Sequence, residues 1–450
     1  MLYKSLNNNS KDVNFEIAVK NGLAEDGGLY FPTKIKPLGK DFFKNITKMS
    51  NHEIAYEVIC QFIGKTIEKK FLLKIIEKTL TFDFPLIEIN NEISSLELYH
   101  GPTLAFKDVG AKFTANCLNY FNEKDENTST ILVATSGDTG AAVANAFFEI
   151  KKTQVIILYP EGKVSDVQEK QLTTNGKNIT AFEVDGTFDD CQKIVKKAFL
   201  DKDLNQILNL TSANSINVAR WLPQSFYYFF AYRDFIKYNK NRNKELCFSV
   251  PSGNFGNICA GLISKNLGLP VKQFIASTNI NDTIPKYLKT GEYLPKQSVE
   301  TISNAMDVGD PSNFKRVMKI FNNDFIKLKK LFSSYSFNDY KTSEAITNVY
   351  KKYNYILDPH GAVGYLGLKK YLKNNKNLNG IFLETAHPIK FSKDVEKSIG
   401  RKIKKPKIIN DLMSKEKKSN KINNYKKFKN KLLEINQMNN LLEDQLPLNV

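Results

Sequence analysis

The sequence predicts an α/β fold in which parallel sheets are covered by helices on both faces. The main observation is that short apolar segments alternate with helical segments over much of the chain, which is typical of βαβ units. A second observation is that several apolar segments lead into loops rich in glycine, serine or threonine. Because ligands of such sheets bind beyond the carboxyl ends of the strands, these loops are the first candidates for a functional site.

The predicted elements follow a mixed, mostly helical region over residues 1–95, which contains a glycine turn at 27–32. Beyond it, apolar runs rich in Ile, Leu and Val predict buried strands. We expect these strands at 131–135, 155–159, 179–184, 246–250, 273–277 and 380–384. Helices are expected among them at 141–148, 167–174 and 258–267.

The length of 450 residues is enough for a large core divided into two or three domains. We expect an N-terminal domain over 1–95, an α/β region with two subdomains over 96–400 and a basic segment over 401–450. That last segment is dense in Lys and Arg but keeps apolar residues at intervals. This pattern favours a solvated segment packed on the body of the protein.

The composition excludes several classes of protein. Hydrophobic residues make up 42% and aromatic residues 12% of the chain, which indicates a globular protein. No apolar run approaches the roughly 18 residues that span a bilayer, and the N-terminus lacks the apolar stretch of a signal peptide. We therefore expect no membrane partner and a cytoplasmic location.

Cysteine and histidine usage points the same way. Five cysteines are spread along the chain without a Cys-x-x-Cys pair, which is typical of free thiols in a reducing compartment. Four histidines form neither an HExxH motif nor a cluster with cysteine, so we expect no metal site.

The net charge of +18 allows three interpretations. A basic protein can bind nucleic acid. Scattered lysines and Lys/Asn tracts such as 374–377 and 417–421 instead favour a bias in composition. Positive charge also helps to capture small anions. We expect a small-molecule partner and no nucleic acid.

The segment 99–112 contains the most informative single residue, Lys107. This lysine follows the apolar residues 104–106 and precedes Asp108. A lysine in apolar surroundings loses hydration, which lowers the pKa of its amine and makes the amine a nucleophile. Burial without chemistry is the competing explanation.

Three loops have the residue types of anion-binding sites. Ser252-Gly-Asn-Phe-Gly-Asn257 follows a strand and begins a helix, so its backbone amides and the helix N-terminus can hold a phosphate. Thr135-Ser-Gly-Asp-Thr-Gly140 offers hydroxyls for a carboxylate. The segment 212–220 combines small polar donors with Arg220, whose guanidinium suits a phosphate. Each loop alone is also typical of a capped helix or a surface turn.

An amine, a phosphate cradle and a carboxylate clamp together are what a phosphorylated carbonyl cofactor and an amino-acid substrate require. Pyridoxal 5'-phosphate fits this set. The segments 98–113, 134–143, 212–217, 250–256, 304–308 and 385–388 also resemble, in this order, the motifs of threonine synthases. The resemblance runs from near residue 1 to about 400, and the last 50 residues are not diagnostic.

The resemblance implies a fold-type II pyridoxal-phosphate enzyme, similar to the tryptophan synthase β subunit. It implies conversion of O-phospho-L-homoserine and water to L-threonine and phosphate, and makes residues 1–95 an N-terminal threonine-synthase domain and 96–400 the catalytic region. Such an enzyme is expected to be a monomer or a homodimer.

The resemblance also implies roles for individual residues. Lys107 matches the lysine that carries the cofactor and moves protons, and Thr385 matches the hydroxyl that faces the pyridine nitrogen. The loop that holds the cofactor phosphate matches Gly253, Asn254, Phe255, Gly256 and Asn257. The loop expected to hold the substrate carboxylate matches Thr135, Ser136 and Thr139. The site that receives the substrate phosphate matches Ser215, Asn217 and Arg220. Asp138, Asp108 and Lys112 receive no definite role.

Three other functions are weighed against this one. A serine/threonine dehydratase-like lyase acts on substrates without phosphate and does not need the Arg220 site. A catalytically silent paralogue that only binds ligands is expected to lack Lys107 or a loop glycine, and this chain has both. A nucleic-acid-binding protein is expected to concentrate its charge in a recognisable module, whereas only the C-terminal segment is densely basic.

Overall fold

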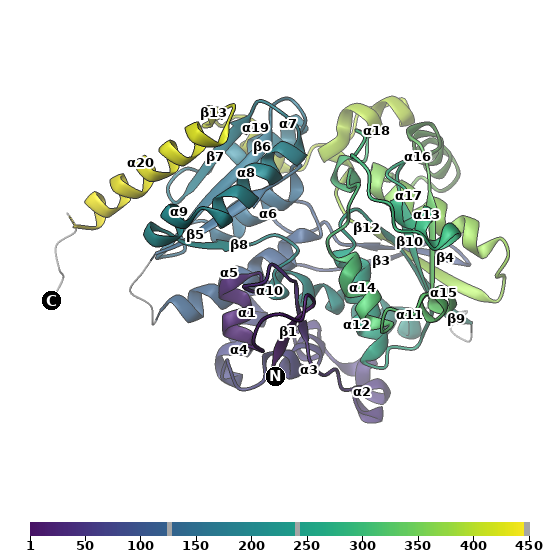
Figure 1. Ribbon diagram of the computed structural model, residues 1–450. Coiled ribbons are helices and arrows are strands. Elements are labelled where there is room, and N and C mark those ends of the chain that lie inside the picture. The colour runs from purple at the N-terminus through teal and green to yellow at the C-terminus, as the bar shows by residue number, and fades with distance from the viewer. Residues whose placement is uncertain (124–127, 239–243, 445–450) are drawn as a thin grey trace.

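A computed structural model describes residues 1–123, 128–238 and 244–444, with side chains to residue 437. Two parallel sheets stand on either side of the molecule, and the N-terminal helices lie below and between them in the view of Figure 1. The inner strands of both sheets are buried along almost their whole length, whereas the edge strands are partly exposed. Each sheet is therefore covered on both faces over its inner strands. The predicted fold class is confirmed.

The larger sheet has six strands in the order β11-β10-β9-β12-β4-β3. Its strands pair in parallel except for β3, which runs antiparallel to β4 at the edge. The strands are β3 (Leu86–Asn90), β4 (Ile93–Glu97), β9 (Glu245–Pro251), β10 (Val271–Thr278), β11 (Phe332–Ser336) and β12 (Leu378–Glu384).

The smaller sheet has five parallel strands in the order β13-β7-β6-β5-β8. They are β5 (Ser129–Ala134), β6 (Thr153–Pro160), β7 (Ile179–Val184), β8 (Asn209–Ser212) and β13 (Asn420–Ile422). All six strands predicted from apolar runs are present in the two sheets. The remaining pair, β1 (Tyr3–Ser5) and β2 (Tyr30–Pro32), forms a small antiparallel ribbon.

Helices connect the strands and cover the sheets. Those near the N-terminus are α1 (Phe15–Asn21), α2 (Lys40–Asn45), α3 (Asn51–Ile63) and α4 (Lys69–Thr79). Those around the smaller sheet are α5 (Lys107–Asn122), α6 (Asp138–Phe147), α7 (Asp166–Thr173), α8 (Phe188–Leu200), α9 (Lys202–Ile207), α19 (Lys407–Met413) and α20 (Tyr425–Asp444). The predicted helices at 141–148 and 167–174 correspond to α6 and α7.

The helices that follow β8 lead into the larger sheet. They are α10 (Val218–Trp221), α11 (Phe226–Tyr238), α12 (Gly256–Asn266), α13 (Thr283–Thr290), α14 (Phe314–Ile320), α15 (Phe325–Leu331), α16 (Asp339–Tyr353), α17 (Pro359–Leu372) and α18 (Ser392–Ile399). Short 3-10 turns are η1 (Ile46–Lys48), η2 (Leu222–Ser225), η3 (Asn304–Met306) and η4 (Pro388–Phe391). Of all helices in the described ranges, none is both long and apolar enough to cross a membrane.

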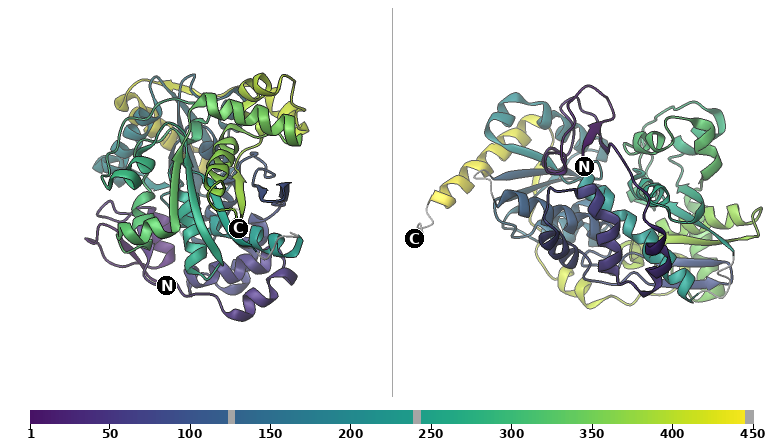
Figure 2. Two further views of the ribbon diagram at one scale, coloured as in Figure 1. Left: turned by 90° about the vertical axis from the view of Figure 1, so that its right-hand side faces the viewer. Right: turned by 90° about the horizontal axis from the view of Figure 1, so that it is seen from below.

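The chain ends are joined to the body more closely than the predicted divisions suggest. The boundary expected between residues 95 and 96 falls inside β4, because β3 and β4 already belong to the larger sheet. At the other end, β13 pairs with β7 as an edge strand, and Lys417 contacts Glu169 and Glu183. Part of the segment 401–450 therefore completes the smaller sheet, whereas α20 extends outward (Figures 1 and 2).

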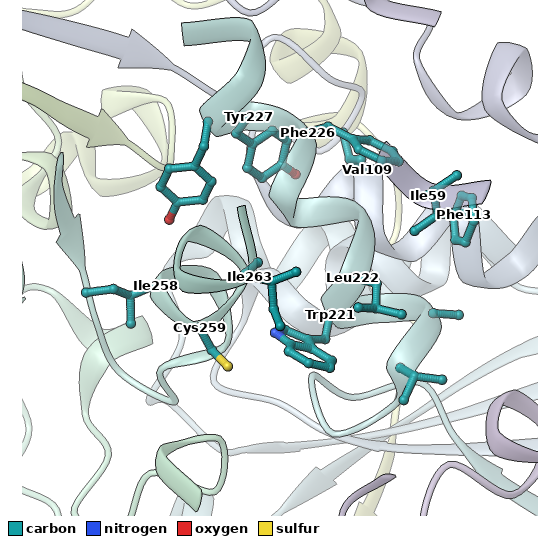
Figure 3. Packing of buried hydrophobic residues seen from close by; sticks show 14 of the residues in the cluster. Ile59, Val109, Phe113, Trp221, Leu222, Phe226, Tyr227, Ile258, Cys259 and Ile263 are labelled. Carbon is teal, nitrogen blue, oxygen red and sulfur yellow. The ribbon is translucent and has the colours of Figure 1, made fainter. Parts of the chain in front are cut away.

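A buried core joins the helices that carry the candidate functional residues. Figure 3 shows Val109 and Phe113 of α5 on one side and Ile258 and Ile263 of α12 on the other, with α10, η2 and α11 between them. Trp221 belongs to this packing and is fully buried. Because such cores are densely packed and resist deformation, the starts of α5 and α12 are held at a fixed spacing.

Candidate active site

The ends of neighbouring strands bring the predicted loops together. In the larger sheet, β9, β12 and β4 are adjacent, and their carboxyl ends lead into residues 252–257, Thr385 and the segment before Lys107. In the smaller sheet, β5 and β8 are adjacent and lead into the loops 135–140 and 213–220. A cavity of about 560 Å³ lies between these two groups of loops.

Lys107 is the first residue of α5 and borders this cavity. The preceding chain is held by a short antiparallel bridge between Ala105 and Ala386. In this bridge the N–H of Phe106 donates to the carbonyl of Thr385 at 2.9 Å. The sequence-distant residues Lys107 and Thr385 are therefore fixed relative to each other by backbone hydrogen bonds.

The amine of Lys107 is poised to lose its proton. Burial lowers its pKa to about 8, and the positive charges of Lys390 and Arg220 act in the same direction, while Asp138 opposes them. An ordinary lysine has a pKa near 10.4, so Lys107 has a far larger neutral fraction at neutral pH. The sequence-based expectation of a desolvated amine agrees with this environment.

The loop 252–257 has little room for side chains. A Cβ on Gly253 would lie 2.7 Å from the carbonyl oxygen of Ala305, and Phe255 adopts a left-handed conformation with φ of 60°. This conformation ends the loop and starts α12 at Gly256. The loop thus brings backbone amides and a helix N-terminus to the cavity, which is the usual arrangement for binding a phosphate.

Two asparagines of this loop have different environments. The amide nitrogen of Asn254 donates to Ser215 at 2.8 Å, and its oxygen accepts from the N–H of Ser312. Asn257 accepts a hydrogen bond from Tyr228 at 2.8 Å, but its buried amide nitrogen has no partner among the described residues. The side chain of Asn254 therefore holds the loop, while Asn257 keeps a free donor.

In the loop 135–140, Thr135, Ser136 and Thr139 all border the cavity. The Thr135 hydroxyl accepts hydrogen bonds from the N–H groups of Gly137 and Gly140, at 3.0 and 2.8 Å. These bonds fold the loop tightly at the start of α6. Thr135 therefore shapes the loop as well as facing the cavity.

The third loop is only partly directed at the cavity. Ser215 and Arg220 border it, whereas Asn217 lies outside the lining. The amide of Asn217 donates to Val19 and Ser212, and its oxygen caps α10 through the N–H of Ala219. All of its hydrogen-bonding groups are thus used to hold the loop, and the structure does not bring Asn217 to the site with the other predicted residues.

Arg220 is buried but keeps an unused donor. Its Nη1 donates to the carbonyl of Ala213, while its buried Nε has no partner among the described residues. Gly110 of α5 permits this position, because a Cβ there would lie 2.5 Å from the Arg220 carbonyl oxygen. An arginine with a free donor beside a cavity is suited to an anionic ligand.

Comparison with known proteins agrees with this geometry. A model of pyridoxal-phosphate dependent enzymes matches residues 87–380, and models of the threonine synthase N terminus and C-terminal part match 2–80 and 361–431. Threonine synthase of Buchnera aphidicola from Acyrthosiphon pisum is 47% identical over 404 residues, covering 89% of this chain and 92% of that protein. The chain belongs to the threonine synthase family.

Solved threonine synthases share the architecture of this family member. The Escherichia coli crystal structure has a TM-score of 0.91 at 39% identity, covering 96% of this chain and all of that one. The pyridoxal-phosphate-bound enzyme of Brucella melitensis has a TM-score of 0.89 at 32% identity, covering 97% and 99%. The match of the C-terminal model to 361–431 extends the family beyond residue 400, where the sequence motifs were not diagnostic.

The residues of this threonine synthase family member fit pyridoxal phosphate, the cofactor of the family. The crowded loop at Gly253, whose space a Cβ would fill, and the amides at the start of α12 are suited to hold a phosphate. The free amide of Asn257 adds an unused donor. Lys107 and Thr385 border the same cavity.

Two further side chains were missed from the sequence, His360 in the cavity lining and Lys390 buried behind Asp138. His360 accepts a hydrogen bond from the N–H of Ala305 through Nε2, so its Nδ1 carries the hydrogen and donates to Asp358 at 2.5 Å. Lys390 forms a buried ion pair of 2.7 Å with Asp138. The apolar neighbours Ile389 and Phe391 are a signal for Lys390 of the same kind that singled out Lys107.

Proposed function

We propose that this chain is a threonine synthase, which converts O-phospho-L-homoserine and water to L-threonine and phosphate with pyridoxal phosphate. The family membership supports this reaction. The observation that carries it is that one cavity is bordered by the low-pKa amine of Lys107, the phosphate cradle at 253–257 and the guanidinium of Arg220.

Cofactor binding would use the larger sheet. The loop 253–257 would hold the cofactor phosphate, Thr385 would face the ring nitrogen and Lys107 would bind the carbonyl carbon. When bound, pyridoxal phosphate supplies a carbonyl that captures amines and a ring that accepts electrons from Cα. A neutral threonine hydroxyl at this position would give the ring nitrogen no strong proton donor.

Substrate binding would use the smaller sheet and α10. Thr135, Ser136 and Thr139 would hold the substrate carboxylate, and Ser215 and Arg220 would hold the substrate phosphate. The free Nε of Arg220 supports this role because a departing phosphate gains charge as its bond to Cγ breaks. Asn217 would act on the same phosphate only through the loop that it holds in place.

Lys107 would move the protons of the reaction. Its neutral amine would take the proton from Cα of the substrate. The proton of Cβ would pass to the phosphate, which departs as hydrogen phosphate when the Cγ–O bond breaks. Lys107 would then give the proton it took from Cα to Cγ. Water would supply a hydroxyl to Cβ and a proton to Lys107, which would return that proton to Cα. Atoms balance, because one water is consumed for each phosphate released.

The test is to purify the protein with pyridoxal phosphate and follow phosphate and threonine formation from O-phospho-L-homoserine. We expect equal amounts of the two products, and a loss of more than about 10⁴-fold in Lys107→Ala because one residue both binds the cofactor and moves protons. Lys402→Ala, at a surface ammonium that pairs with Glu396, should keep full activity. Ammonia release from serine or threonine without turnover of the phosphorylated substrate would instead identify a dehydratase.

The proposed location of the enzyme is the cytoplasm. Five free cysteines suit a cytoplasmic location, and a monomer or homodimer without nucleic acid or membrane partners is expected. Gel filtration with light scattering measures the oligomeric state, and a gel-shift assay over a range of salt concentrations measures nucleic-acid binding.

A further inference from the structure

Lys390 is a buried lysine for which the proposed reaction has no role. It lies in η4, just beyond Thr385, and its side chain is fully shielded from solvent. Its ammonium lies 2.7 Å from Oδ1 of Asp138 and donates to the carbonyl of Thr103 at 2.9 Å. A lysine is almost never fully buried unless it is paired, so this position has a specific cause.

Asp138 is the carboxylate beside Lys107. It is the first residue of α6, borders the cavity and also accepts a hydrogen bond from Gln168 at 2.9 Å. Burial favours its neutral acid form, but Lys390, Lys107 and His360 together hold its pKa below the ordinary range. Asp138 is therefore an anion that attracts both Lys107 and the buried Lys390.

The two lysines interact with Asp138 in different ways. Lys390 forms a direct ion pair with the carboxylate. Lys107 interacts with it electrostatically, and the positive charges of Lys390 and Arg220 act on Lys107 in the opposite direction. Charged side chains farther along the lining are Asp189, Asp190, Lys193 and Lys196 of α8, and Lys296, Asp307 and Asp310 of the loops. The pKa of Lys107 is instead set by burial and by the charges of Asp138, Lys390 and Arg220.

We propose that Lys390 is a positioning residue that neutralises Asp138 and thereby prevents this carboxylate from pairing with Lys107. The proposal rests on the role of Lys107 as the reactive amine. Lys390 and Asp138 then act as one neutral unit, and Lys107 faces a dipole in place of a bare anion. Without Lys390, Asp138 would hold Lys107 as an ammonium, which neither binds a carbonyl nor takes a proton.

The two halves of the ion pair should have opposite effects on Lys107. Removal of the ammonium in Lys390→Met leaves an anion beside Lys107 and raises its pKa. Removal of the anion in Asp138→Asn leaves a cation and lowers it. The double variant Lys390→Met/Asp138→Asn removes both charges and should return the pKa of Lys107 close to that of the natural protein.

The experiment measures Lys107 directly in the full-length chain prepared without cofactor. A brief pulse of acetic anhydride at a series of pH values modifies only neutral amines, and peptide mass spectrometry reports the modified fraction of Lys107. We expect the midpoint to lie near pH 8 in the natural protein. It should rise by about one pH unit or more in Lys390→Met and fall in Asp138→Asn. Lys402→Met, at a side chain that is 92% exposed, is the matched control and should leave the midpoint unchanged.

The proposal can still be tested if the Lys390→Met variant does not fold. If Lys390→Met fails to give the circular dichroism spectrum of the natural protein, the midpoint of Asp138→Asn is compared with that of the double variant, which reports the charge of Lys390 alone. A midpoint that is the same in these two variants, or single variants that shift it in one direction, would overturn the proposal. Because no substrate is used, this outcome is independent of whether the chain makes threonine.

Discussion

The amide nitrogen of Asn254 donates a hydrogen bond of 2.8 Å to the hydroxyl of Ser215. This bond joins the loop after β9 in the larger sheet to the loop after β8 in the smaller one. The proposed cofactor-phosphate site and the proposed substrate-phosphate site therefore share one contact, and a change in one loop should affect the other.

A double-mutant cycle tests this link. We expect Asn254→Ala to weaken pyridoxal-phosphate binding by about five- to tenfold, since a hydrogen bond contributes about 1 kcal/mol. Ser215→Ala should weaken it less, and the double variant should be no worse than Asn254→Ala, because the partners are then both removed. The measurement is a cofactor titration followed by fluorescence or calorimetry. Additive losses would mean that the two loops act separately.

A methyl group at Gly253 should disrupt the phosphate cradle. In Gly253→Ala the new Cβ would lie 2.7 Å from the carbonyl oxygen of Ala305 and 2.8 Å from Cα of Met306, both of them backbone atoms. We expect the loop to shift and cofactor affinity to fall by more than about tenfold, equivalent to about 1.4 kcal/mol. Gly39→Ala is the matched control, because nothing lies within 4 Å of its Cβ. Unchanged affinity in Gly253→Ala would place the cofactor phosphate elsewhere.

Arg220 should matter more for the substrate than for the cofactor. Arg220→Lys keeps the charge but loses the fork of donors, so we expect KM for O-phospho-L-homoserine to rise by about 10- to 100-fold, the range of a charge-assisted hydrogen bond. Cofactor affinity should stay within about twofold. Arg233→Lys, which pairs with Asp234 outside the cavity, serves as the control. Equal losses of both affinities would identify Arg220 as a structural arginine.

Lys417 should hold the C-terminal segment on the smaller sheet. It lies 2.7 Å from Glu169 and 2.9 Å from Glu183, and Lys417→Met leaves the buried Glu183 without this partner. We expect the free energy of unfolding in urea to fall by about 1 kcal/mol, as for a partly exposed pair. Lys402→Met should have little effect, because its ammonium is almost fully exposed.

The loss of unfolding free energy in Lys417→Met should become smaller at high pH. Although burial acts in the other direction, hydrogen bonds to Glu169 and Glu183 raise the pKa of Lys417 above its ordinary value. A raised pKa in the folded state contributes stability below the unfolded pKa of about 10.4 and loses it as pH rises further. The difference between the natural protein and Lys417→Met should therefore be constant near neutral pH and shrink above about pH 10.4. A difference that grows with pH would contradict the assignment.

The sequence pattern correctly predicted those features that depend on residues close together in the chain. Strand β7 lies at Ile179–Val184, as its apolar run predicts. The strands β5, β6, β9, β10 and β12 begin one or two residues before their predicted ranges and end within one residue of them. The apolar neighbours of Lys107 correctly indicated a desolvated amine. Such features depend on side chains close in the chain, so composition and periodicity report them directly.

Pairing between strands that are distant in the sequence determined which candidate site residues lie together. Residues 252–257, Thr385 and Lys107 meet only because β9, β12 and β4 are neighbours, although the strands are far apart in sequence. The same pairing across distance directs the amide of Asn217 to Val19, away from the cavity, and brings Lys390 onto Asp138. The sequence by itself determined the fold class and which residue types carry the chemistry. The tertiary structure decided which of them face one another, because hydrogen bonds and charges act through space between segments that the order of residues does not place together.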